Sequence, residues 1–311
     1  MSTVSKPAPK ASFGERLKKQ KYLQMMVWPG IIWMFIFNYI PMSGIIIAFK
    51  DYKITGTMWG APWAGLSHFK EFLTDPSFMN IMQNTLGISL LKLCIAFPLP
   101  ILFALLVNEV RSARYKKSIQ TISYLPHFIS WVVLGGLLIT WLSDTGMINE
   151  VLVMTGILKE PIAFLADPKY FWWVAVISDT WKELGWSAII YIAAISGIDQ
   201  QMYEAAAIDG ATKMQKIWHI TLPAIKGTIA VMFILAVAGM LNSNFDQIFI
   251  LNNVLNAEAS EVIDTYVYKM GMRSGRYSYA TAIGLFKSVV AMILLVIANF
   301  ITKKLQGRSL F

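Results

Sequence analysis

The chain has 311 residues, of which 56% are hydrophobic and 14% are charged, and its formal net charge is +9. A soluble domain carries about 25% charged residues, so this composition excludes a large soluble globule and predicts an all-α, polytopic membrane protein. The positive charge does not form a stripe with interleaved stacking aromatic residues, so we expect no nucleic-acid partner.

Six segments are apolar over about 20 or more residues, the length that a helix needs to cross a bilayer core of about 30 Å. The fourth contains the polar stretch Ser178–Gly185, which makes it the weakest of the six. We expect residues 1–22 to form a basic cytoplasmic tail and residues 23–311 to form one membrane domain. The predicted spans are Leu23–Phe49, Thr85–Val107, Ile119–Leu142, Phe171–Ile195, Thr228–Leu251 and Thr281–Ile301.

The lysine and arginine residues are distributed unevenly between the two sides of the predicted membrane. One side holds both tails, the segment 111–117 and the loop 197–226, and it collects 16 of the 27 basic residues, whereas the opposite side collects eight. The positive-inside rule therefore places both termini and this loop in the cytoplasm. The N-terminal tail is interpreted as either an amphipathic helix on the inner leaflet or a simple orientation anchor.

The loop 197–226 is a polar, alanine-rich island between two apolar segments. Asp199 is a good N-cap for a short helix, and Gly210 suits the left-handed position that ends such a helix. Thr212 precedes a glutamine at capping-box spacing, which starts a second helix, and Pro223 is expected to break the chain before the fifth span. The sequence therefore predicts a helix, a tight turn and a second helix.

The two short helices of this loop each have a face of small or adaptable side chains. Met202, Ala205 and Ala206 share one side of the first helix, and Met214 and Trp218 share one side of the second. These faces either pack on the transmembrane helices of the same chain or dock on a cytoplasmic partner.

The loop also contains a motif. Glu204-Ala205-Ala206, then Gly210 after three residues, then Ile220-Thr221-Leu222-Pro223 after nine more, resembles the EAA loop of ABC-importer permeases at every defined position. Gly227 departs from many relatives, which have a second proline there. Three further segments are similar to the oligosaccharide and polysaccharide branch of carbohydrate permeases: Phe37–Tyr52, Ser123–Val133 and Asn242–Leu251.

The resemblance implies a type I ABC-importer permease fold in which the loop is a coupling helix, seated in a groove of a separate ATPase. Glu204 would face a basic group of the ATPase, and Gly210 would form the turn. ATP and Mg²⁺ would be bound by that partner, since this sequence has no G-x-x-x-x-G-K-[ST] phosphate loop. The residues implied for ATPase coupling are Glu204, Ala205, Ala206, Asp209, Gly210, Met214, Leu222 and Pro223.

The same resemblance implies partners and a cargo. We expect two ABC ATPase subunits, an extracellular lipoprotein solute-binding protein and a second permease, which is a different chain or a second copy of this one. The cargo would be a carbohydrate, with an oligosaccharide favoured. An ion-coupled secondary carrier or channel and an intramembrane enzyme are the alternatives. His68, His127 and His219 lie in distant regions without metal-ligand spacing, so we expect no metal and no catalytic site.

Polar side chains within predicted spans are costly, so they usually face a cavity or a partner. In the family, spans four to six line the sugar path, and sugars bind to planar polar groups and aromatic faces. Asn242 and Asn244 are the favoured candidates. Interhelical hydrogen bonds, Lys182–Asp179 pairs and interfacial tryptophans are the alternative interpretation. The full candidate set is Asn242, Asn244, Phe245, Asp246, Gln247, Trp181, Trp186, Asp179, Glu183, Tyr279 and Thr281.

The outer loops have family roles by the same resemblance. Residues 51–84 and 143–170 would form a rim that receives the binding protein. The segment 252–280 either re-enters toward the cavity or contacts that protein, and the sequence leaves both possibilities open.

Overall fold

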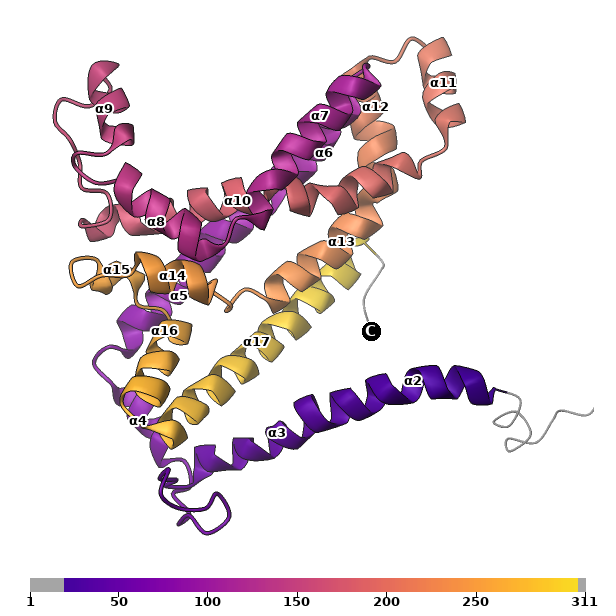
Figure 1. The fold of residues 1–311 in the computed structure, drawn as a ribbon. Helices are drawn as coiled ribbons and strands as arrows, with labels where there is room; N and C mark the ends of the chain where they lie inside the picture. The colour runs from indigo at the N-terminus through magenta and orange to yellow at the C-terminus, as the bar shows by residue number, and fades with distance from the viewer. Residues whose placement is uncertain (1–19, 307–311) are drawn as a thin grey trace, which may run out of the picture.

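The computed structural model describes residues 20–306, which are mostly helical (Figure 1). Within these residues the one β-type pairing is an isolated antiparallel bridge between Lys50 and Trp63. The predicted all-α class is therefore confirmed. The predicted basic tail, residues 1–22, lies almost wholly outside the described residues.

The first span is a long apolar helical segment, Lys21–Phe49, which confirms the predicted span Leu23–Phe49. Its one buried residue is Ala48, near its end. Figure 1 shows that α2 and α3 extend away from the other helices. The segment meets them at its end, where η2 packs against α17. Its apolar surface therefore has to be covered by lipid or by another subunit. Its parts are α2 (Lys21–Met34), η1 (Phe35–Tyr39), α3 (Ile40–Met42) and η2 (Ser43–Phe49).

The second span consists of two helices in direct succession, α5 (Phe78–Ile95) and α6 (Pro98–Asn108). Together they extend the predicted span Thr85–Val107 at both ends. The prolines of α6 lie in its first turn, where the missing N–H group costs nothing. A short helix, α4 (Ser67–Thr74), precedes the span.

The third predicted span, Ile119–Leu142, is not straight, because its two halves meet at an angle of 93°. The bend follows a 3₁₀ turn that contains a proline, and Ser130 caps the second half by accepting a hydrogen bond from the Val133 amide at 3.3 Å. The pieces are α7 (Ala113–Tyr124), η3 (Leu125–Phe128) and α8 (Trp131–Trp141), and α9 (Met147–Met154) follows in the next loop.

The fourth predicted span, Phe171–Ile195, is one uninterrupted helix, α10 (Pro168–Ser196), of 29 residues. The polar stretch Ser178–Gly185 does not break it. Because α10 packs against α5, α6, α7 and α13, it occupies the centre of the molecule. Of the polar stretch, Ser178, Thr180 and Lys182 are buried.

The fifth span differs from the prediction at both ends. The expected break at Pro223 is wrong, since one helical segment continues from Lys213 to Ala238. A wider π turn directly before the proline gives its ring room within the helix. The predicted span Thr228–Leu251 is also wrong, because the helix ends at Ala238. The pieces are α11 (Gln200–Ile208), α12 (Lys213–Lys216), η4 (Ile217–Thr221), α13 (Leu222–Ala238) and α14 (Phe245–Leu251).

The segment after α14 folds back on the bundle. Its middle helix packs against α5, α14 and α17, so much of the loop is part of the protein core. The last span, α17, contains the predicted Thr281–Ile301 and lies beside α13. The elements are α15 (Ala257–Ser260), α16 (Ile263–Tyr268), η5 (Lys269–Arg273) and α17 (Tyr277–Gln306).

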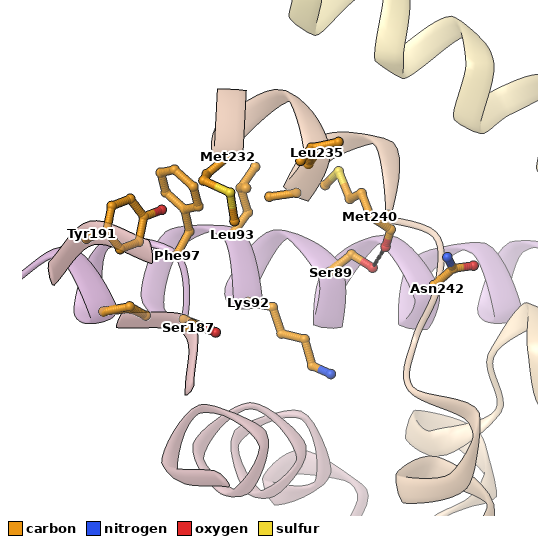
Figure 2. A pocket seen from close by; sticks show the side chains of 14 residues that line it. Ser89, Lys92, Leu93, Phe97, Ser187, Tyr191, Met232, Leu235, Met240 and Asn242 are labelled. Carbon is orange, nitrogen blue, oxygen red and sulfur yellow. Dashed lines mark hydrogen bonds between the residues drawn. The ribbon is translucent and has the colours of Figure 1, made fainter. Parts of the chain in front are cut away.

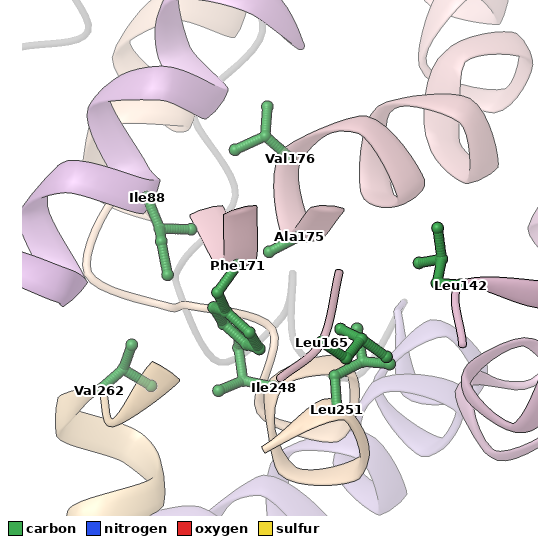
Figure 3. Close-up of a cluster of buried hydrophobic side chains, with 9 residues drawn as sticks. All are labelled: Ile88, Leu142, Leu165, Phe171, Ala175, Val176, Ile248, Leu251 and Val262. Atoms are coloured by element: carbon green, nitrogen blue, oxygen red, sulfur yellow. The ribbon is translucent and has the colours of Figure 1, made fainter. Parts of the chain in front are cut away.

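Three buried clusters hold the helices together. In the cluster of Figure 3, Phe171 of α10 lies between Ile88 of α5 and Ile248 of α14. A second cluster joins α6, α10 and α13 around Tyr191. The third joins α4 to α16 and α17 around Phe72.

Within the described residues, four helices are long and apolar enough to cross a membrane, and the bent pair gives a fifth. The predicted fourth span, α10, is long enough but carries more charge than the others. Its crossing remains a prediction, and so does the count of six.

Candidate functional site

The loop 197–226 folds as its local signals predict. Asp199 caps α11 by accepting a hydrogen bond from the Gln201 amide at 3.0 Å. Gly210 has a φ of 75°, the left-handed conformation that a glycine adopts without strain. Thr212 and Gln215 then form a capping box at the start of α12. The helix, turn and second helix are thus confirmed.

The loop is fixed to the ends of the neighbouring spans. The Tyr203 hydroxyl of α11 lies 2.8 Å from Thr221 Oγ1 of η4, and the Tyr203 ring packs against the cluster around Tyr191. Lys213 Nζ lies 3.2 Å from a carboxylate oxygen of Glu109, just after α6. Because these contacts reach two spans, a force applied to α11 would be passed to the bundle.

The surface of the loop that points away from the spans is not covered by other described residues of the chain. None of the residues of α11 is buried, and the helix projects from one end of the molecule (Figure 1). Glu204 and Ala205 are exposed, as are Met214 and Trp218 on the second helix. Ile208 is 88% exposed. It lies four residues after Glu204, so helical spacing could have identified it, although the sequence analysis did not.

A cavity of about 400 Å³ lies between α5, α6, α10 and α13. In Figure 2, apolar side chains of α13 close one side, and Asn242 lies just beyond the end of that helix. Asn242 is exposed, so its amide is free to meet a ligand. The other polar side chains that line the cavity are Ser89, Lys92, Ser187 and Tyr191.

Other candidates from the sequence are occupied by contacts between helices. The Asn244 amide donates to Asp179 Oδ1 at 2.8 Å, and Asp179 Oδ2 lies 3.0 Å from Lys92 Nζ. The partner of Asp179 is therefore Lys92 of α5, and not Lys182. Gln247 is fully buried and donates to the Ala175 carbonyl at 2.7 Å.

A second polar group lies where α10 crosses the bend between α7 and α8. Glu183 accepts from His127 Nδ1 at 2.7 Å and from Lys182 Nζ at 3.1 Å. The His127 ring stacks on Trp186 with centroids 4.3 Å apart. Trp181 lies elsewhere, in an apolar cavity of about 440 Å³ lined by α8, α9 and α10.

The remaining candidates lie outside the cavity between α5 and α13. Phe245 stacks on Phe249 with centroids 5.2 Å apart, and Asp246 is exposed in the first turn of α14. Tyr279 is buried near the start of α17, and the Thr281 hydroxyl donates to a carbonyl of its own helix. The structure thus places only Asn242 of the predicted set at that cavity. It adds Ser89, whose signal in the sequence is a hydroxyl three residues before Lys92 in an apolar helix.

A model of the family described as binding-protein-dependent transport system inner membrane component matches residues 96–308. The chain belongs to this family. The match begins in the second span and includes the loop 197–226, α13, α14 and α17. The permease is therefore a membrane-embedded transport subunit whose ATPase is a separate chain, and it is not itself an enzyme.

Full-length relatives agree with this assignment. Protein LplB of Bacillus subtilis is 45% identical over 297 residues, which cover 95% of this permease and 92% of the relative. The polygalacturonan/rhamnogalacturonan transport system permease protein YteP of Bacillus subtilis gives the same identity and coverage.

A solved structure gives the same result in three dimensions. A chain of a bacterial ABC transporter involved in the import of the acidic polysaccharide alginate superposes with a TM-score of 0.86 at 40% identity, covering 94% of this permease and 98% of that chain. The predicted type I importer fold is thus confirmed.

Proposed function

We propose that this permease is one of two transmembrane subunits of an ATP-driven importer, and that it forms half of the path for an oligosaccharide. The observation that carries the proposal is the exposed α11 with its Glu204-Ala205-Ala206 motif, held rigidly on the spans but uncovered by the chain itself. An ion-coupled carrier has no need of such a projecting element.

The cargo is an oligosaccharide delivered by an extracellular binding protein. This assignment is supported by the relative named for polygalacturonan and rhamnogalacturonan transport. It is also supported by an alginate transporter solved in complex with its alginate pentasaccharide-bound periplasmic protein, whose permease chain has a TM-score of 0.87 and 39% identity to this one. In the present permease, Asn242 at the edge of the cavity is the polar group best placed to contact a sugar.

The coupling role belongs to the outer face of the loop 197–226. Glu204 faces a basic group of the ATPase, while Ala205, Ala206 and Ile208 enter its groove. Closure of two ATPases on ATP then rocks two permeases between inward-facing and outward-facing states. The ion pair between Lys213 and Glu109 supports this proposal, because it joins the loop to the end of the second span.

A second permease covers the first span. The segment Lys21–Phe49 is apolar over its length, and only 6% of its most apolar window is buried within this chain. A helix that is hydrophobic on all sides is normally surrounded by apolar neighbours. A different permease chain is the favoured partner, and a second copy of this chain is the alternative.

The loop 197–226 and both chain termini lie in the cytoplasm. The charge bias of the sequence supports this orientation. Figure 1 adds that the beginning of α2, the end of α17 and α11 lie toward the same end of the molecule, away from α4 and α15.

Uptake by the purified assembly tests the proposal. Proteoliposomes that contain both permeases and the ATPase, with the binding protein outside, are given a labelled galacturonate, alginate or neutral oligosaccharide. We expect uptake of at least one of them to require internal ATP and to be insensitive to ionophores. Uptake that survives without ATP and collapses with the ion gradient would instead establish a secondary carrier.

A further inference from the structure

The fifth span ends at Ala238, and residues 239–244 separate α13 from α14. This short connecting segment is called the interruption. Asn244 ends it with a φ of 55°, and it is the one non-glycine residue with positive φ in the described part of the chain. Asparagine adopts this left-handed conformation more readily than most residues other than glycine, and the contacts of its side chain help to hold it there.

Two carboxylates from different helices fix the interruption at its end. Asp179 of α10 accepts from the Asn244 side-chain amide at 2.8 Å. Asp264 of α16 accepts from the Ser243 backbone amide at 3.3 Å. The two acceptors therefore hold two successive residues of the same short segment.

Each carboxylate is paired with a lysine from a further span. Asp179 Oδ2 lies 3.0 Å from Lys92 Nζ of α5. Asp264 pairs in the same way with Lys287 of α17. All four side chains are largely buried, with side-chain exposures between 15% and 22%. The desolvation cost of a buried ion pair can exceed the attraction between its charges, so these two pairs call for a role beyond stability.

The interruption also has an anchor at its beginning. The Ser89 hydroxyl of α5 donates to the Met240 carbonyl, as the dashed line in Figure 2 shows. Asn242 lies between this anchor and the two carboxylate contacts. Its backbone amide donates to the Gly239 carbonyl at 2.8 Å, while its side chain makes no hydrogen bond within the described residues. Its exposed side chain is therefore placed at the cavity by its neighbours on both sides.

We propose that Lys92–Asp179 and Lys287–Asp264 are positioning pairs. They fix the non-helical conformation of residues 239–244 and keep Asn242 at the edge of the cavity. The inference rests on the proposed function only where it concerns transport. Each carboxylate contacts a lysine ammonium and also an amide of Ser243 or Asn244. Hydrogen bonds that involve a charged group are stronger than those between neutral groups.

The labelling of a cysteine at position 242 tests the positioning independently of transport. Cys94 is the single cysteine of the chain, so Cys94→Ser with Asn242→Cys provides one reporter, probed with a small cationic methanethiosulfonate reagent in the assembled transporter. Two double variants, Lys92→Met/Asp179→Leu and Lys287→Met/Asp264→Leu, remove each pair without leaving an unpaired charge. Each is expected to change the labelling rate by about tenfold, the effect of losing a hydrogen bond to a charged acceptor.

A matched control removes an ion pair that does not touch the interruption. Lys269 and Glu261 lie 2.9 Å apart, and Lys269→Met/Glu261→Leu is expected to leave the labelling rate unchanged. If a double variant does not fold, Asp179→Glu keeps the charge and displaces only the acceptor. It is expected to change the rate in the same direction.

Labelling at the parental rate in folded variants of both pairs would overturn the inference. Sugar uptake is then measured for the same double variants with asparagine restored at position 242. An increased KM with little change in kcat agrees with a positioned sugar contact. A changed labelling rate with an unchanged KM would keep the positioning pairs and reject the role of Asn242, so the two ideas fail separately.

Discussion

At the scale of single residues, one glycine decides how two spans cross. A Cβ atom on Gly185 of α10 would lie 2.1 Å from the carbonyl oxygen of Ser123 in α7. Backbone atoms cannot move aside as a flexible side chain can, so these helices approach closely only because position 185 has no side chain. The sequence showed Gly185 merely as part of a polar stretch, since the atom that it must avoid is 62 positions away.

We therefore predict that Gly185→Ala destabilises the permease. Overpacking at a close contact costs about 1–3 kcal/mol. Gly136→Ala in α8 is the matched control, because no heavy atom lies within 4 Å of its added Cβ. Thermal unfolding followed by size-exclusion chromatography should show a lower unfolding midpoint for Gly185→Ala. The control, Gly136→Ala, should keep the parental midpoint. Equal midpoints would contradict the crossing geometry.

A second glycine acts through its backbone alone. Gly210 has no neighbour within 4 Å of an added Cβ, so Gly210→Ala meets only the left-handed φ of 75°, a strain of about 1–2 kcal/mol. We expect a lower yield of copurified ATPase from this variant. Gly197→Ala, at an ordinary negative φ and with contacts no closer than 3.5 Å, should keep the parental yield.

At the scale of elements, Asp75 lies where the ends of α4, α5, α16 and α17 meet. It precedes α5, and it accepts from the hydroxyls of Tyr266 and Tyr279 at 2.9 Å and 3.2 Å. Burial raises the pKa of Asp75, but the hydrogen bonds from Ser77 and from the two tyrosines outweigh it and hold the pKa below its ordinary value. The ionised form therefore stabilises this junction.

The sign of the pH dependence follows from that direction. A lowered folded pKa contributes stability that is present above the unfolded value of about 3.9 and is lost as the pH falls further. We predict that the midpoint of thermal unfolding falls between about pH 5 and pH 3, and that Asp75→Asn makes this fall shallower. An identical pH profile for the variant would show that Asp75 does not contribute.

Local patterns predicted the elements whose causes are local. The cap at Asp199, the turn at Gly210 and the capping box at Thr212 each depend on residues within three positions, and all three were confirmed. The predicted span Thr228–Leu251 was wrong for the opposite reason. Apolar residues lie on both sides of residues 239–244, whereas the groups that anchor this segment, such as Asp179 and Asp264, come from distant parts of the chain.

The candidate site was predicted less completely than the fold. Intramembrane polarity identified Asp179, Asn244 and Gln247, but it could not separate a ligand contact from a contact between helices. The structure assigns all three to contacts between helices. Tyr279 looked available at the start of a span and is instead buried under α4, because the packing of Phe72 is not visible in a linear pattern.

At the scale of the whole molecule, one helical segment joins the loop 197–226 to the cavity beside Asn242. The segment Lys213–Ala238 extends from the loop 197–226 to the interruption at residues 239–244. A displacement of α11 is therefore passed along one helix to the neighbourhood of Asn242. The central claim is that α11 contacts the ATPase in the cytoplasm, and a cross-linking measurement tests it most directly.

In the Cys94→Ser background, Ile208→Cys places a reactive thiol on α11, and Val254→Cys, at a residue 92% exposed after α14, places one toward the opposite end. With a bifunctional thiol-to-amine reagent on the complete transporter, the account predicts a covalent adduct between position 208 and the ATPase and none from position 254. An Ile208→Cys protein that forms no ATPase adduct, or that an impermeant reagent labels from outside intact cells, would contradict it.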